Sequence, residues 1–186
     1  MTTLTATTFT QDRRIAALGA FGFALALAAA AQIAIPIPGT PVPVTMQPLV
    51  VVLAGLMLGP VFGAASMLTY LAMGAAGLPV FAPIGAPGVL RLIGPTGGYL
   101  IATPFAAFLA GYLSQRFPSF VGRWAAAMAG LVVIFVGGIS QLAILTGSLG
   151  QAFAFGLTPF AAFDVLKALV AAAIARPRIR SNAAQE

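Results

Sequence analysis

Asp164 and Lys167 stand out because they are the only charged residues inside the long apolar segments of this sequence. A charge near the centre of a bilayer costs at least about 2.5 to 3.5 kcal/mol, so such residues usually mark a functional site. Their i,i+3 spacing places both on one helix face, where they can contact each other. Together they offer an acceptor beside a donor, which suits a ligand with an N–H next to a C=O, such as a ureido or amide group. The alternative is an ion pair that only satisfies itself inside the protein.

Arg91 is the third candidate and lies in the Gly- and Pro-rich stretch 78–100. This stretch cannot form one continuous helix, yet it is too apolar for an ordinary solvated loop. Irregular backbone at membrane depth is tolerated only where it is buried in protein or lines a cavity. We therefore expect a cap over a ligand, with Arg91 beneath it to pair with a carboxylate. The alternative for Arg91 is an interfacial side chain that reaches toward the lipid headgroups.

Other polar residues flank the same stretches and could add hydrogen bonds, although each could equally be a helix cap or an interface anchor. They are Thr45, Gln47, Thr96 and Tyr99.

Several classes of chemistry are excluded by residues that the chain lacks. It has no cysteine and no histidine, which removes thiolate and imidazole catalysis, disulfides and nearly every zinc site. It has no GxxxxGK[ST] motif for ATP hydrolysis and no carboxylate pair for acid–base work. We expect no enzyme activity, no metal and no cofactor, so the energy for any transport must come from a partner or a gradient.

Composition identifies the chain as an integral membrane protein. Of its 186 residues 60% are hydrophobic and 6% are charged, against roughly 25% charged residues in soluble domains. The net charge of +6 does not indicate nucleic-acid binding, because the basic residues are not gathered with aromatic side chains on one surface. They follow the pattern that sets orientation in a lipid bilayer.

The elements that must position the candidate residues are six apolar segments, which predict an all-α membrane protein with six transmembrane helices. The second and third are shorter than the roughly 20 residues of a perpendicular span, and only Gly59-Pro60 separates them. The first could also be a cleavable export signal after Arg13 and Arg14, but we favour an uncleaved span because the rest of the chain is itself membrane segments. The predicted segments are 15–33, 48–58, 61–75, 98–113, 125–145 and 159–175.

The domain organisation that follows is a polar tail at 1–14, a membrane domain at 15–176 and a basic tail at 177–186. Six crossings place both termini on one side, and the positive-inside rule makes that side the cytoplasm. The Pro-rich connection 34–47, expected to be extended, the cap and the uncharged Gly-rich exit 146–158 then meet on the outer side. A helix starting near residue 159 would place Asp164 roughly 9 Å below its outer end. Seven of the nine basic residues fall on the inner side: Arg13, Arg14, Arg116, Arg123, Arg176, Arg178 and Arg180.

Small residues recur every fourth position in the first segment, at Ala16, Ala20, Ala24 and Ala28. Such a face lets another helix approach closely. It could pack inside this protein or form the interface with a partner, and the sequence leaves the two readings equal.

At this point the chain resembles the BioY family, the biotin-specific substrate-binding (S) components of energy-coupling-factor (ECF) transporters. The resemblance rests on PVPVTMQPLVVVLAGLMLG, GLPVFA before a Gly-rich run, GPTGGYL, and the Asp164 to Lys167 pair. It implies an S-component-like bundle in the cytoplasmic membrane that binds biotin from outside. It also implies as partners a transmembrane coupling protein and two cytosolic ATPases, and it adds weight to the alanine face as an interface.

The resemblance implies that Asp164 and Lys167 hold the ureido ring and that Arg91 holds the carboxylate, with Gln47 and Tyr99 as further contacts. Pro83 and Ile84 stand where some relatives carry a polar amide, so Arg91 is expected to do more here. Other readings are an S component for another small vitamin, a solitary secondary transporter that needs no energising module, and a structural or assembly protein.

Overall fold

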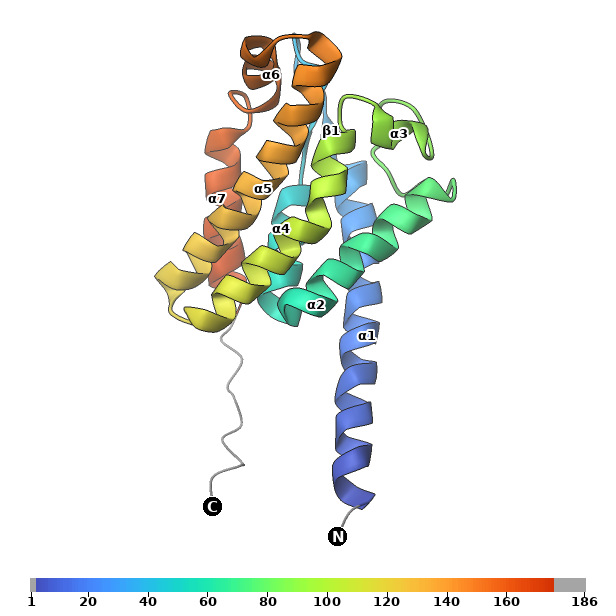
Figure 1. The fold of residues 1–186 in the computed structure, drawn as a ribbon, viewed down its shortest axis with the longest axis vertical. Coiled ribbons are helices and arrows are strands. Elements are labelled where there is room, and N and C mark those ends of the chain that lie inside the picture. Colours follow the sequence, from blue (N-terminus) through green and yellow to red (C-terminus); the bar gives the residue numbers. More distant parts are fainter. Residues whose placement is uncertain (1–2, 176–186) are drawn as a thin grey trace.

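The structure is a computed structural model that describes the backbone of residues 3–175 and the side chains from residue 14 onward. This part of the chain forms seven helices and one short hairpin (Figure 1). The predicted basic tail, with Arg178 and Arg180, lies outside the described residues. The helices are α1 (Thr3–Gln32), α2 (Gln47–Ala75), α3 (Leu90–Ile93), α4 (Gly97–Arg116), α5 (Phe120–Thr146), α6 (Leu149–Gly156) and α7 (Ala161–Ile174), and the strands are β1 (Ala34–Ile35) and β2 (Val44–Thr45).

Four helices are long and apolar enough to cross a membrane, and they correspond to five of the predicted segments. They are Arg14–Gln32 within α1, α2, α4 and α5. A fifth candidate is the pair α6 and α7, which is bent by 52°. The apolar part of α1 agrees with the predicted first segment, while the helix itself starts at Thr3 and so extends into the predicted polar tail.

The second and third predicted segments form the two halves of α2, which breaks at Gly59. There the backbone has φ 80° and ψ −178°, a conformation that is essentially restricted to glycine. Pro60 follows, and a proline is favourable at the first position of a new helical stretch. Figure 1 shows that the chain reverses here, so the second half runs back toward the end of the molecule that carries α3.

The Pro-rich connection and the cap have the kinds of structure that were predicted for them, extended and irregular. The Pro-rich connection contains β1 and β2, which pair antiparallel with Ala34 opposite Thr45. The cap, defined here as residues 77–96, is irregular except for the single turn α3. Hairpin, cap and α6 all lie at one end of the helix bundle, opposite the connection between α4 and α5 (Figure 1).

The uncharged, Gly-rich connection after α5 contains a helix that the sequence analysis did not predict, α6. Ser148 caps this helix by accepting a hydrogen bond from the backbone N–H of Gln151, at 3.3 Å. As a consequence the last helix starts at Ala161, and Asp164 lies in its first turn. The predicted depth of about six residues is therefore wrong. The N-terminal end of the α7 dipole favours the negative charge of the carboxylate there.

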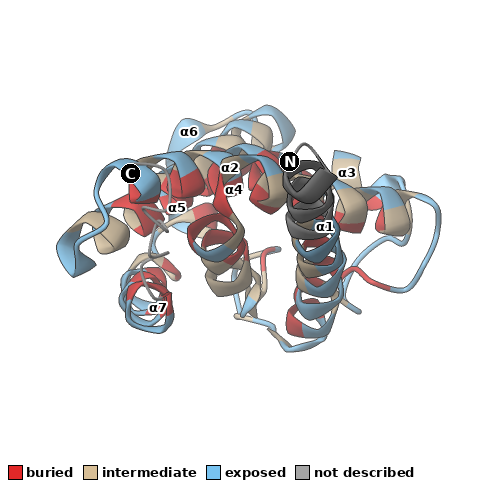
Figure 2. Ribbon diagram, turned by 90° about the horizontal axis from the view of Figure 1, so that it is seen from below, coloured by how far each residue is buried: buried red, intermediate tan, exposed pale blue. Residues whose placement is uncertain are grey.

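Figure 2 shows the buried residues of the helix bundle in red, and small residues bring the helices of this core into close contact. One close crossing joins α2 to α4, where a Cβ atom added at Gly55 would lie 2.3 Å from the carbonyl oxygen of Ala107. Such a contact excludes any side chain larger than hydrogen and locks the bent α2 against α4.

The alanine face of α1 points into this core. Ala20 is 6% exposed and Ala24 is fully buried, while Ala16 and Ala28 are half-buried. Of the two readings of this face, the burial favours packing within the chain at Ala20 and Ala24, because neither side chain is free to contact a partner in this arrangement.

Candidate ligand-binding site

A pocket opens between the hairpin, the cap, the N-terminal halves of α2, α4 and α7, and the middle of α5. It holds about 750 Å³ of unfilled space, a value that includes its open mouth. All five predicted ligand contacts line it, together with Thr45 and Thr96. Its lining residues are Val42, Pro43, Thr45, Gln47, Pro48, Val51, Ala82, Arg91, Thr96, Tyr99, Leu100, Thr103, Ile134, Phe135, Phe160, Asp164 and Lys167.

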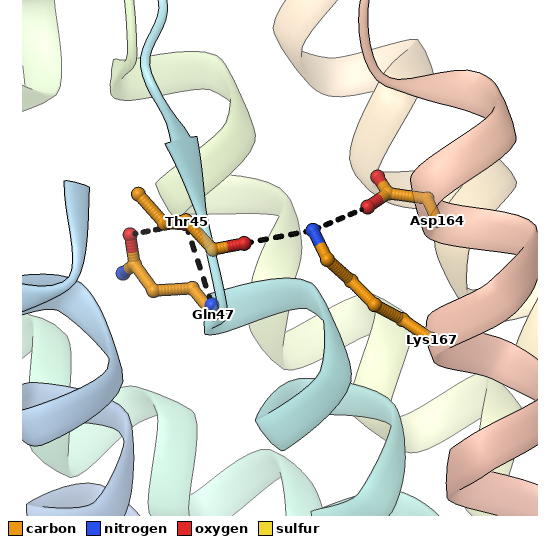
Figure 3. Close-up of polar contacts among 4 residues, drawn as sticks. All are labelled: Thr45, Gln47, Asp164 and Lys167. Atoms are coloured by element: carbon orange, nitrogen blue, oxygen red, sulfur yellow. Dashed lines mark hydrogen bonds and ion pairs between the residues drawn. The ribbon is translucent and has the colours of Figure 1, made fainter. Parts of the chain in front are cut away.

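The predicted ion pair is present in the pocket wall (Figure 3). Lys167 Nζ lies 2.7 Å from Asp164 Oδ1 and also donates to the carbonyl oxygen of Thr45 at 2.7 Å. Asp164 is 5% exposed and Lys167 is 9% exposed. The ammonium group has three donors, so one remains for a ligand. The second carboxylate oxygen of Asp164 points away from Lys167 in Figure 3 and accepts no hydrogen bond from residues 3–175.

Gln47 is positioned by a residue that the sequence analysis missed. Its Nε2 donates to the hydroxyl of Tyr70 at 2.9 Å, and its Oε1 accepts from the hydroxyl of Thr45 at 3.3 Å. Tyr70 is fully buried and its ring contacts Phe81 of the cap edge to face, with centroids 5.4 Å apart. A tyrosine within an apolar segment is the only signal that the sequence offers for this role.

Tyr99 lines the pocket with its ring, but its hydroxyl is already engaged. It donates to the carbonyl oxygen of Gly156, at 2.9 Å, and so fastens the end of α6 to α4. The ring fits because Gly138 faces it on α5, where an added Cβ would lie 2.2 Å from ring atoms. The structure therefore indicates that Tyr99 shapes the apolar wall rather than offering a free hydroxyl.

Arg91 is 6% exposed and lies within the loop of the cap. Its terminal nitrogens donate to the backbone carbonyls of Ala82 and Ile84. Its Nε is buried and has no hydrogen-bond partner among the described residues. Burial lowers the pKa of the Arg91 guanidinium because desolvation disfavours its charge, yet an arginine remains protonated in any protein environment. Arg91 is thus a fixed cation in the cap, and its Nε is an unused hydrogen-bond donor.

Two glutamines that the sequence analysis did not single out join the cap to the helix bundle through hydrogen bonds. Gln141 Nε2 on α5 donates to the carbonyls of Leu92 at 3.0 Å and Gly94 at 2.6 Å. Gln32 Nε2 at the end of α1 donates to the carbonyl of Phe81 at 3.2 Å. Polar side chains in or beside apolar segments are the signal that could have identified both.

The arrangement has the chemistry of recognition rather than of reaction. A hydrogen-bond donor and an acceptor lie together on α7, and a cation lies in the cap. Apolar side chains such as Val51, Leu100 and Phe135 line the same pocket. Groups of three or more His, Cys, Asp or Glu residues that could hold a metal ion are absent from residues 3–175.

Comparison with known proteins identifies relatives over most of the chain. The model of the BioY family matches residues 3–184. A probable biotin transporter BioY from Pyrococcus horikoshii is 42% identical over 142 residues, which cover 76% of this chain and 83% of that protein. The biotin transporter BioY of Thermotoga maritima is 40% identical over 135 residues, covering 73% of this chain and 79% of that protein.

A solved structure is also similar. It is the crystal structure of the S-component for biotin from an ECF-type ABC transporter, which superposes with a TM-score of 0.80 at 26% sequence identity. The match covers 89% of this chain and 91% of that one.

Proposed function

The chain belongs to the BioY family, and from this premise we propose that it captures biotin for uptake across the cytoplasmic membrane as the substrate-binding component of an ECF-type transporter. The observation that carries the proposal is that one pocket gathers Asp164, Lys167 and Arg91 from distant parts of the chain. Biotin is the ligand that the matched transporters and the matched S-component are named for.

In this proposal the ureido ring of biotin binds at the ion pair on α7. The free oxygen of Asp164 accepts a hydrogen bond from the ring N–H, and the remaining N–H of the Lys167 ammonium group donates a hydrogen bond to the ring carbonyl. Both groups are nearly withdrawn from water, which makes each hydrogen bond more selective. The fused ring and aliphatic chain then contact apolar wall residues, and their burial drives binding.

The carboxylate of biotin binds Arg91 in the cap. The unpartnered Nε supports this role, because a carboxylate can accept from Nε and a terminal nitrogen at once. A terminal nitrogen of Arg91 then gives up its hydrogen bond to a cap carbonyl and donates to the ligand instead. This exchange links ligand binding to the conformation of the cap.

The proposed topology has six crossings: α1, the two halves of α2, α4, α5, and α7 with α6 at its entrance. The cap, the hairpin and α6 face outward, and the termini together with Arg116 and Arg123 face the cytoplasm. The positive-inside pattern supports this orientation. The chain has no ATP-binding motif, so a transmembrane coupling protein and two cytosolic ATPases supply the energy for release inward.

Equilibrium binding of biotin to the purified protein in detergent tests the proposal. We expect saturable binding that weakens at least tenfold, about 1.4 kcal/mol, in both Asp164→Asn and Arg91→Ala. Arg116→Ala is the matched control, because Arg116 stacks on Tyr112 at the opposite end of the bundle and should leave binding unchanged. A folded wild-type protein that does not bind biotin would refute the proposal.

A further inference from the structure

The cap contains a second cavity behind Arg91. It holds about 480 Å³ of unfilled space, including its own open mouth, and it is enclosed by cap residues. They are Gly77, Leu78, Pro79, Phe81, Ala82, Pro83, Gly85, Pro87, Gly88 and Arg91. The lining is aliphatic and aromatic, and its one charged group is Arg91.

The two cavities share a wall. Ala82 and Arg91 line both the main pocket and the cap cavity, and no other residue appears in both linings. The shared Arg91 is 6% exposed, and its buried Nε donor has no partner among the described residues. Ala82 offers only a methyl group. The carboxyl end of a ligand held by Arg91 would therefore lie at the boundary between the two cavities.

We propose that the cap cavity receives a chain attached to the carboxyl end of biotin, so that the site accepts biotin amides of aliphatic amines as well as free biotin. This inference rests on the proposed function, since it needs the carboxyl end at Arg91. The amide carbonyl accepts from the Arg91 guanidinium, as one carboxylate oxygen would. The aliphatic chain passes Ala82 and lies against the apolar side chains of the cap cavity.

The chemistry of the cavity favours this class of ligand. Leu78, Phe81 and the three prolines offer apolar surface, which suits methylene groups and not a second charge. The mouth of the cavity is formed by exposed residues such as Leu78, which is 49% exposed. A polar end on a longer chain, such as the backbone of a lysine joined to biotin through its side-chain amine, would therefore emerge into water.

The test compares three ligands on the purified protein: biotin, biotinamide and N-butylbiotinamide. Biotinamide has the amide without a chain, so it isolates the effect of losing the carboxylate. We expect N-butylbiotinamide to bind within threefold of biotinamide by calorimetry. At least tenfold weaker binding than biotinamide would overturn the inference, because the chain would then have no room. Failure of biotin itself to bind would refute the proposed function, and the inference would fall with it.

A larger side chain in the cap cavity should weaken the binding of the ligand that carries a butyl chain and leave the other two ligands unaffected. In Leu78→Trp we expect N-butylbiotinamide to bind at least tenfold more weakly, with biotin and biotinamide within threefold of wild type, while Leu78→Met serves as the control of similar volume. Equal weakening of all three ligands, or of none, would count against the inference. Retained biotin binding reports a folded protein. Pro87→Trp provides a second way to fill the cavity if Leu78→Trp does not fold.

Discussion

At the level of single residues, the site depends on a buried charge pair that is completed by the backbone. Asp164 and Lys167 satisfy each other only in part, and the carbonyl of Thr45 supplies the second contact of the ammonium group, at 2.7 Å from Nζ. Taking charges out of water is costly, and their mutual attraction often fails to recover that cost. A pair retained at such a position is better explained by a ligand than by stability.

Removing one charge should cost much more stability than removing both. Lys167→Met should lower the free energy of unfolding by about 3–5 kcal/mol, because it leaves the Asp164 carboxylate buried without a partner. The double variant Asp164→Asn with Lys167→Met should recover most of that loss and still fail to bind biotin. Thermal unfolding in detergent and biotin binding, measured on the same samples, test this. A double variant that binds like wild type would show that the pair is only structural.

The sequence predicted this pair because its signal is local: two charges in an apolar run, at a spacing that puts them on one face. Thr45 and Tyr70 could not be assigned in the same way. Their contacts join residues that are 122 positions apart, for Thr45 with Lys167, and 23 apart, for Tyr70 with Gln47. Such contacts depend on how the helices pack, which periodicity does not determine.

At the level of elements, the cap is an irregular segment held by side chains from the helices on either side. Gln141 donates to two carbonyls of the cap, and Gln32 to another. Irregular backbone leaves carbonyls that need hydrogen-bond partners outside a helix, so the glutamines contribute to how firmly the cap is seated.

Gln141→Leu should loosen the cap and speed the release of biotin. It removes two hydrogen bonds, each worth about 0.5–1.5 kcal/mol, so we expect the dissociation rate to rise roughly tenfold. Gln151→Leu is the matched control, because Gln151 is an exposed glutamine on α6. Stopped-flow displacement of biotin measures the rate, and hydrogen exchange at residues 92–97 should rise in parallel. An unchanged dissociation rate in Gln141→Leu would mean that the cap does not limit release.

The break in α2 could be predicted from the sequence, whereas α6 was missed. Gly59-Pro60 combines a residue that tolerates unusual backbone with one that cannot continue a helix. The stretch that forms α6 contains Gly150 and Gly156, which lower its helix propensity, although Ser148 and Gln151 form an S-x-x-Q pattern typical of a helix start. That one missed helix explains why the expected start of the last span and the expected depth of Asp164 were both wrong.

At the level of the whole molecule, the proposed orientation can be tested directly because the chain has no cysteine. Ala86→Cys places a thiol in the exposed part of the cap, and Pro118→Cys places one in the connection between α4 and α5. In intact cells a membrane-impermeant maleimide should label Ala86→Cys and not Pro118→Cys, and permeabilisation should make both reactive. Labelling of Pro118→Cys in intact cells would reverse the topology.

The helical membrane architecture and the residues that line the pocket were predictable from apolar segments and from the few polar residues inside or beside them, while the count of six crossings stays a prediction. The cap cavity was not predictable, since it depends on how one loop folds around Arg91. Burial of the alanine face was also not predictable, because small residues suit internal packing and partner docking equally well.

The contact between Lys167 and Thr45 has a consequence for biosynthesis. Thr45 leaves the ribosome well before Lys167, so the pocket stays without its α7 wall until α7 has been synthesised. A nascent chain stalled before Ala161 would contain most of the predicted membrane segments and neither member of the ion pair. In the proposed function, biotin binding therefore requires that synthesis has passed α7 and that this helix has been inserted beside the hairpin.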